Sequence, residues 1–233
     1  MKKYLILMLV QSILIAAAII NSSFKPEVLA VNTLATTDWS LTPIYSKTYF
    51  DNGVLKAEGR LLDSNKIGWW NFYYSNNNIK KKGAYLKGEK HGFWETFYKN
   101  GQTELLLEWN QGLKSGWAKR YFENGKLNWV GEFKDDQKTG LWKSFYSNGE
   151  LKETGFFSHN TKVGWWRFWD ANGNILEEGD YANNQKNGFY KTFYADSLLK
   201  TEGYYFNDEP TGEWRYYKED GRFDQVIKIE DDE

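Results

Sequence analysis

A single repeat length governs this chain, because glycine recurs every 24 residues without an insertion. Two further glycine series keep the same period, and only Asn77, Ser197 and Leu107 interrupt them. A fixed period of about 20 to 50 residues is the signature of a repeat array, in which each unit is completed by packing on its neighbours. The uninterrupted series is Gly68, Gly92, Gly116, Gly140, Gly164, Gly188 and Gly212.

Each unit contains two strand-like segments and two turns. The segments are about six to eight residues long and rich in Trp, Tyr, Phe and Leu, which favours strands over helices. The first turn is Asn-Gly or a close variant, a strong hairpin signal because a type I′ turn needs positive φ at both central residues. The second turn is polar and ends on glycine. A lysine recurs in it, at Lys66, Lys90, Lys114, Lys138, Lys162 and Lys186.

These signals predict an all-β fold. We expect an elongated antiparallel β-meander of tandem 24-residue hairpin repeats, preceded by an N-terminal hydrophobic helix. At the spacing of neighbouring strands, the array is expected to hold roughly fifteen strands over about 70 Å.

A two-residue Asn-Gly loop would fix the cross-strand pairs and therefore the faces of the sheet. It predicts that Trp142 lies opposite Gly155, with the ring covering the glycine, and that Tyr146 lies opposite Leu151. A three-residue loop with a bulge is the alternative, and it would shift the face assignments by one residue. The same spacing pairs Trp70 with Gly83, Trp166 with Gly179, Tyr190 with Gly203 and Phe122 with Leu127.

The face with the tryptophans is therefore expected to carry rows of stacked rings, whose main role is packing between units. The opposite face is expected to hold one aromatic residue per unit among charges. These residues are Tyr73, Phe97, Tyr121, Phe145, Trp169, Phe193 and Tyr217.

The first twenty residues form a separate segment. Lys2 and Lys3 precede an uncharged, mostly apolar run from Tyr4 to Ile20. Residues 1–20 are predicted to be a signal peptide, or an N-terminal membrane anchor if residues 4–20 stay attached. In both cases the lysines remain cytoplasmic, and the rest of the chain is exported to the periplasm, outer envelope or extracellular space.

The remaining boundaries follow from composition. Residues 21–43 show no period and contain Pro26 and Pro43, so they are predicted to be a linker. Residues 44–229 are the predicted repeat array. Residues 230–233 are an acidic tail.

Composition excludes several classes of function. The net charge of -1, from 30 Lys plus Arg and 31 Asp plus Glu, argues against a nucleic-acid partner. The absence of cysteine excludes disulfides, a thiolate nucleophile and thiolate metal sites. His91 and His159 fall at different positions of the unit, in polar turns, and are predicted to be exposed. No metal, phosphate-binding or Gly-x-Ser-x-Gly motif is present, so we predict a protein that is not an enzyme and uses no metal or cofactor.

The unit resembles the MORN-repeat family, and most closely its bacterial variant. The matching pattern is Gly-x-Trp-x-x-aromatic-aromatic-x-Asn-Gly-x-Leu, followed by Gly-x-aromatic and a lysine-containing turn. It is clearest from Gly140-Leu141-Trp142 through Asn148-Gly149-Glu150-Leu151 to Gly155-Phe156-Phe157, and the resemblance covers roughly residues 45–227. The resemblance implies a β-hairpin array that acts as a scaffold or partner-binding module. It also implies a phospholipid-binding role, which is attributed to some members.

We therefore expect an exported scaffold that binds a protein partner through its aromatic sheet face, because Trp and Tyr are favoured interface anchors. The alternatives are a glycan-binding module of the cell envelope and association with a membrane surface through the row of turn lysines. The candidate binding residues are Trp70, Trp94, Trp142, Trp166, Trp214, Tyr85 and Tyr181.

Overall fold

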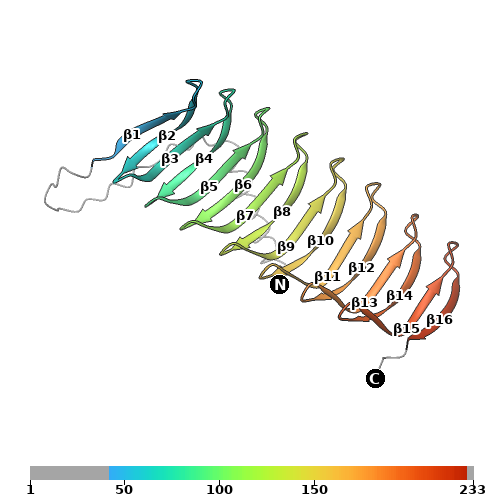
Figure 1. Ribbon diagram of the computed structural model, residues 1–233. Coiled ribbons are helices and arrows are strands. Elements are labelled where there is room, and N and C mark those ends of the chain that lie inside the picture. The colour runs from blue at the N-terminus through green and yellow to red at the C-terminus, as the bar shows by residue number, and fades with distance from the viewer. Residues whose placement is uncertain (1–41, 230–233) are drawn as a thin grey trace, which may run out of the picture. The chain divides into compact units, whose positions relative to one another are not determined.

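The computed structural model describes residues 42–229, which form one antiparallel sheet of sixteen strands. Each strand is hydrogen-bonded to the strands before and after it in the sequence, so the hairpins follow one another in a single row (Figure 1). The predicted all-β meander is confirmed, with sixteen strands instead of fifteen. The predictions for residues 1–20, for most of residues 21–43 and for residues 230–233 concern residues outside the described part.

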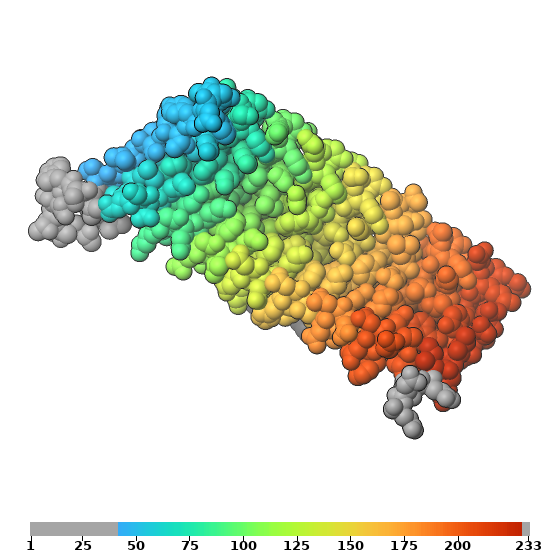
Figure 2. Space-filling view, viewed as in Figure 1, coloured from blue at the N-terminus to red at the C-terminus, as the bar shows by residue number. Residues whose placement is uncertain are grey.

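The strands repeat in length as well as in sequence, because those after β2 and before β16 alternate between nine and eight residues. Colour bands succeed one another without a gap across the space-filling view, as expected if every hairpin packs against the next (Figure 2). The strands are β1 (Ile44–Tyr49), β2 (Leu55–Leu62), β3 (Asn65–Tyr73), β4 (Ile79–Leu86), β5 (Glu89–Phe97), β6 (Thr103–Asn110), β7 (Leu113–Tyr121), β8 (Leu127–Lys134), β9 (Gln137–Phe145), β10 (Leu151–Ser158), β11 (Thr161–Trp169), β12 (Ile175–Ala182), β13 (Gln185–Phe193), β14 (Leu199–Phe206), β15 (Glu209–Tyr217) and β16 (Phe223–Ile229).

The Asn-Gly loops are not the two-residue turns that the sequence predicts. Two-residue turns occur instead at the polar ends of the hairpins. In the Asn-Gly loop after β9, Gly149 donates to the carbonyl of Tyr146 over 2.9 Å, and only Gly149 has a positive φ, of 97°. This is a three-residue loop closed by a left-handed glycine. The two-residue turns with positive φ at both central residues are the polar ones, such as Asp135 and Asp136, at 50° and 65°.

The three-residue loop changes the pairing beside it but not in the body of the hairpin. Phe145, not Tyr146, lies opposite Leu151, and Tyr121, not Phe122, lies opposite Leu127, so those two predictions were wrong. One bulge residue in the second strand restores the register. The predicted pairs of Trp142 with Gly155, Trp70 with Gly83, Trp166 with Gly179 and Tyr190 with Gly203 are confirmed.

The ring that covers each glycine comes from the neighbouring strand of the following unit, not from the partner strand of the same hairpin. A Cβ added to Gly155 would lie 2.2 Å from the indole of Trp166, so the predicted cover by Trp142 was wrong. The cause is a second bulge, between β10 and β11, where Gly164 adopts a φ of 63° and the pairing of these two strands is interrupted opposite Gly155. Trp70, Trp94, Trp142, Tyr190 and Trp214 cover Gly59, Gly83, Gly131, Gly179 and Gly203 in the same way.

In one unit the large and the small side chain are exchanged between the glycine position and the tryptophan position. At the glycine position stands Leu107, and at the matching tryptophan position of the next unit stands Ala118. Both are buried, and they pack in one cluster with Phe133 and Trp142. The large side chain therefore comes from the opposite strand, and the space between the units stays filled.

Candidate interaction surfaces

The sheet has two chemically different faces, and the one that carries the covering rings is called the ring face below. Within residues 42–229 no helix or second sheet covers either face. The five candidate tryptophans are nevertheless almost inaccessible, with exposures of 3% for Trp70, 4% for Trp94, 5% for Trp142, 1% for Trp166 and 4% for Trp214. Tyr85 and Tyr181 are half-buried.

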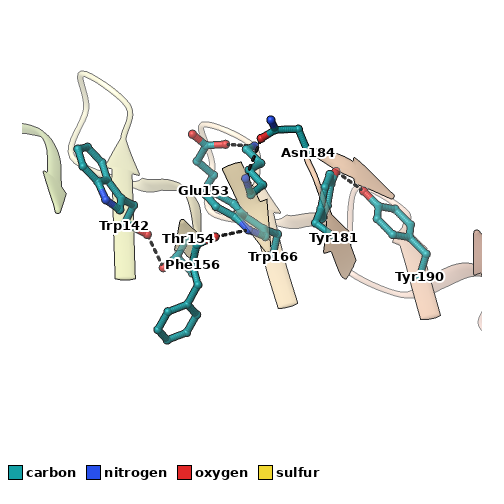
Figure 3. Close-up of polar contacts among 9 residues, drawn as sticks. Trp142, Glu153, Thr154, Phe156, Trp166, Tyr181, Asn184 and Tyr190 are labelled. Atoms are coloured by element: carbon teal, nitrogen blue, oxygen red, sulfur yellow. Dashed lines mark hydrogen bonds and ion pairs between the residues drawn. The ribbon is translucent and has the colours of Figure 1, made fainter. Parts of the chain in front are cut away.

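Close ring contacts explain this burial. Tyr85 meets Trp94 edge-on with 4.9 Å between ring centroids, and Phe157 meets Trp166 edge-on at 5.0 Å. The indole nitrogen of Trp166 donates to the carbonyl of Phe156 over 3.2 Å, while the Phe156 side chain points to the other side of the sheet (Figure 3). The structure thus brings the candidate rings together for packing. Contact of these seven residues with a partner remains a prediction, and the five indoles have little exposed area for it.

The recurring lysines lie in strands, not in turns as the sequence predicts. Each is half-buried on the ring face, with its ammonium over an aromatic ring. The ammonium of Lys162 lies 4.2 Å from the ring centroid of Trp166, and that of Lys186 lies 4.1 Å from that of Tyr190. The lysines therefore extend the ring row instead of forming a basic rim along the turns.

Carboxylates accompany these lysines only in the C-terminal half of the described residues. Glu153 pairs with Lys162 over 3.1 Å, and Glu177 pairs with Lys186 over 3.4 Å. The third residue of β4, which is equivalent to Glu153 in β10, is a further lysine, Lys81. Among residues 42–229, no ion pair within 4.0 Å involves Lys66, Lys81, Lys90 or Lys114.

The lysine cluster in the N-terminal half is electrostatically strained. Burial, and next the positive charges of Lys80 and Lys66, lower the pKa of Lys81. Burial, followed by the charges of Lys81 and Lys114, lowers the pKa of Lys90. Burial also lowers the pKa of Lys138, but there Glu153 acts in the opposite direction.

The opposite face carries a row of apolar side chains, called the exposed column below; its first four members are exposed, and its last two, Trp165 and Phe189, are half-buried. Five of its members directly precede a covering ring, and Trp117 precedes Ala118 at the equivalent position, so the alternation of a strand places them on the other side of the sheet. Phe93 is 69% exposed, Trp117 59% and Trp69 55%. The column consists of Trp69, Phe93, Trp117, Leu141, Trp165 and Phe189.

The column widens toward the C-terminal end of the array. Leu141 pairs with Phe156, which is 51% exposed, and Phe189 pairs with Tyr204, whose ring centroid lies 5.3 Å away. Beside the second pair lies a shallow hollow of about 320 Å³, which is also lined by Glu202, Glu213 and Arg215.

Several charges on this face form ion pairs with one another. Arg167 lies 2.6 Å from Glu178, and Lys82 lies 3.0 Å from Glu95. Burial, and next a 2.6 Å hydrogen bond to Glu58, raise the pKa of Tyr73 to about 12, so this predicted opposite-face residue stays a neutral donor at physiological pH. On this face Trp69, Phe93 and Trp117 are the members of the column that are more than half exposed.

Sequence reasoning missed the exposed column, although a signal was present. In Gly68-Trp69-Trp70 and Gly92-Phe93-Trp94, two consecutive bulky residues follow the glycine. Because neighbouring strand residues point to opposite faces, only one of the two can join the ring row. The other has to be exposed in a sheet of one layer.

The two histidines lie in different parts of the array. His159 occupies a two-residue turn and is exposed, as predicted, whereas His91 is exposed but lies in β5, not in a turn. Within residues 42–229, no three His, Asp or Glu side chains gather in a way that would hold a metal ion. No helix of the same residues has the length and hydropathy to cross a membrane.

Comparison with solved structures returns distant likenesses. The TCP10 domain of Danio rerio CPAP, solved with a peptide of Danio rerio STIL, is 14% identical, with 81% of this chain and 100% of that chain covered and a TM-score of 0.26. The TcdB2-TccC3 structure is 13% identical, with 77% of this chain and 13% of that chain covered and a TM-score of 0.16. At these scores the likenesses carry no argument about this chain. No curated protein matches it.

A family model identifies the repeat itself. The model described as MORN repeat variant matches residues 138–159 and 162–183, two successive units from the middle of the array. Both segments contain the lysine, the bulge glycine and the covering tryptophan described above. These two adjacent units are therefore repeats of the MORN variant family, as the sequence pattern predicts.

Proposed function

We propose that this protein is a non-enzymatic scaffold that binds a protein partner through the exposed column. The observation that carries the proposal is the row of large apolar side chains on a face where Arg167 pairs with Glu178 and Lys82 with Glu95. Trp69, Phe93 and Trp117 are each more than half exposed, and they recur on every second strand, about 9.6 Å apart. Contiguous exposed aromatic surface marks interaction sites more often than chance exposure does.

A protein partner fits this surface better than a small molecule. Small-molecule sites are concave and few, whereas the column repeats one motif along an open sheet. A protein interface can span several units and anchor a separate side chain at each one. Repeat scaffolds present extended surfaces of this kind.

The test compares two sets of alanine substitutions in the full chain. Trp69→Ala, Phe93→Ala and Trp117→Ala together are expected to abolish retention of proteins that the unchanged chain captures from a cell-envelope extract. Leu86→Ala and Leu113→Ala, which truncate exposed apolar residues near the turns, are the matched control and should leave capture intact. Loss with both sets, or with neither, would count against the column.

Glycan-array and liposome-flotation assays run beside the capture experiment. They address the two other functions that the sequence leaves open. The proposal would be contradicted if the chain bound a polysaccharide or vesicles tightly, lost this binding in the column variant, and captured no protein partner.

The proposal includes export, which rests on the sequence of residues 1–20 alone. Two lysines followed by an apolar run are expected to direct the chain across the membrane. Fractionation of cells that express a C-terminally tagged chain should place the array outside the cytoplasm. Recovery of the full-length chain in the cytosol would contradict this expectation, and the size of the exported product separates a cleaved signal from a retained anchor.

A further inference from the structure

The charge of the ring face differs between the N-terminal and C-terminal halves of the array. The exposed column lies on the other face and does not contribute to this difference. Two of the recurring lysines in the C-terminal half pair with a glutamate nine residues earlier in the sequence. Glu153 pairs with Lys162, and Glu177 pairs with Lys186. The residue nine before Lys90 is instead Lys81. The same face therefore changes from internally neutralised to cationic along the array.

The cationic part is built into the packing of the rings. The ammonium of Lys90 lies 3.9 Å from the ring centroid of Trp109 and 4.9 Å from that of Trp94. Lys81 lies 4.7 Å over Phe72, and Lys66 lies 5.2 Å over Trp70. Rings hold the three ammonium groups in place, but a ring contact does not supply the negative charge that Glu153 and Glu177 supply elsewhere.

The row has a regular spacing across the strands. Lys66, Lys90 and Lys114 stand at equivalent positions on β3, β5 and β7, so they recur at two strand spacings, about 9.6 Å. A peptide in polyproline II conformation advances about 3.1 Å per residue, or about 9.3 Å over three residues. Carboxylates at every third residue of such a segment match this row.

We propose that Lys66, Lys81, Lys90 and Lys114 form a binding site for an extended acidic segment of a protein partner, with carboxylates three residues apart. The site lies on the ring face and is separate from the exposed column. Charge complementarity selects the segment, and the surrounding half-buried rings exclude water from the ion pairs. The lowered pKa of Lys81 and of Lys90 is consistent with cations that lack a counter-charge.

A lipid surface is the less favoured source of negative charge. A flat bilayer contacts the side chains that protrude furthest, whereas these lysines are half-buried among aromatic rings. Anionic vesicles nevertheless belong in the test as a separate arm.

The probe is a fluorescent nonapeptide with Glu at positions 1, 4 and 7 and Ala or Gly elsewhere, titrated with the full chain at low ionic strength. We expect saturable binding that weakens as salt is added, because screening shortens the reach of the charges. A peptide with Gln at the same three positions should not bind. A peptide with Glu at positions 1, 3 and 5 should bind at least fivefold more weakly, because its carboxylates miss the row spacing.

The decisive variant is Lys81→Glu, which installs the side chain that Glu153 and Glu177 supply in the later units. The new carboxylate can pair with Lys90 as Glu153 pairs with Lys162, so the fold should be kept while peptide binding falls at least tenfold. Lys80→Glu makes the same charge change at the neighbouring, exposed residue and should alter binding less than twofold.

Two results would overturn the site. One is equal loss with Lys81→Glu and Lys80→Glu, or no loss with either. The other is binding to vesicles of phosphatidylglycerol without binding to the nonapeptide. The column variant with Trp69, Phe93 and Trp117 changed to Ala should bind the nonapeptide normally, so failure of this site and failure of the proposed scaffold surface can be told apart.

Discussion

Gly155→Leu is expected to destabilise the array strongly, and adding Trp166→Ala to it is expected to restore stability. The leucine would begin with a Cβ that lies 2.2 Å from the indole of Trp166, a distance that no side-chain rotation relieves. Overpacking of a filled core costs about 1 to 3 kcal/mol and sometimes more, and we expect about 3 kcal/mol here. Trp166→Ala alone is expected to cost about 3 to 5 kcal/mol, because the ring is 1% exposed.

The natural exchange at Leu107 and Ala118 is the reason to expect rescue. There a leucine at the glycine position packs against an alanine at the tryptophan position, and both are buried. The double variant should therefore be more stable than either single variant, which requires a coupling energy in a double-mutant cycle larger than the loss of about 3 to 5 kcal/mol expected for Trp166→Ala alone. Urea unfolding of the four chains measures this coupling. If the losses in unfolding free energy were additive, the side chains at positions 155 and 166 would not compete for the same space.

The repeat period made most of the fold predictable. Glycines at a fixed spacing, with strand-like segments between them, determine strand number and order in a meander to within one strand. The pairing of Trp142 with Gly155 also follows, because a bulge after the loop compensates for the extra loop residue. The sequence could not show that the covering ring is Trp166, since this depends on the bulge at Gly164, which interrupts the pairing of β10 with β11 opposite Gly155.

The candidate site was less predictable. Packing and recognition both favour aromatic residues, so composition alone does not separate Trp69 from Trp70. The lysines were misplaced for a related reason: they follow the turns closely in sequence, yet Lys66 is already the second residue of β3. Only the register shows that its ammonium lies over Trp70.

Two adjacent indoles in one unit, Trp69 and Trp70, have opposite roles. Trp70 is 3% exposed, covers Gly59 and donates its indole N–H to the carbonyl of Arg60 over 3.1 Å. Trp69 is 55% exposed on the other face. The same substitution at the two positions therefore removes a packed ring in one variant and a free ring in the other.

Equilibrium unfolding of Trp70→Ala and Trp69→Ala, measured side by side, distinguishes these two roles. Trp70→Ala is expected to lower the free energy of unfolding by about 3 to 5 kcal/mol, through the lost ring contacts and the cavity left behind. Trp69→Ala is expected to stay within about 0.5 kcal/mol of the unchanged chain, as exposed substitutions do. Equal losses, or a larger loss for Trp69→Ala, would contradict the division of the sheet into a packed ring face and a free column.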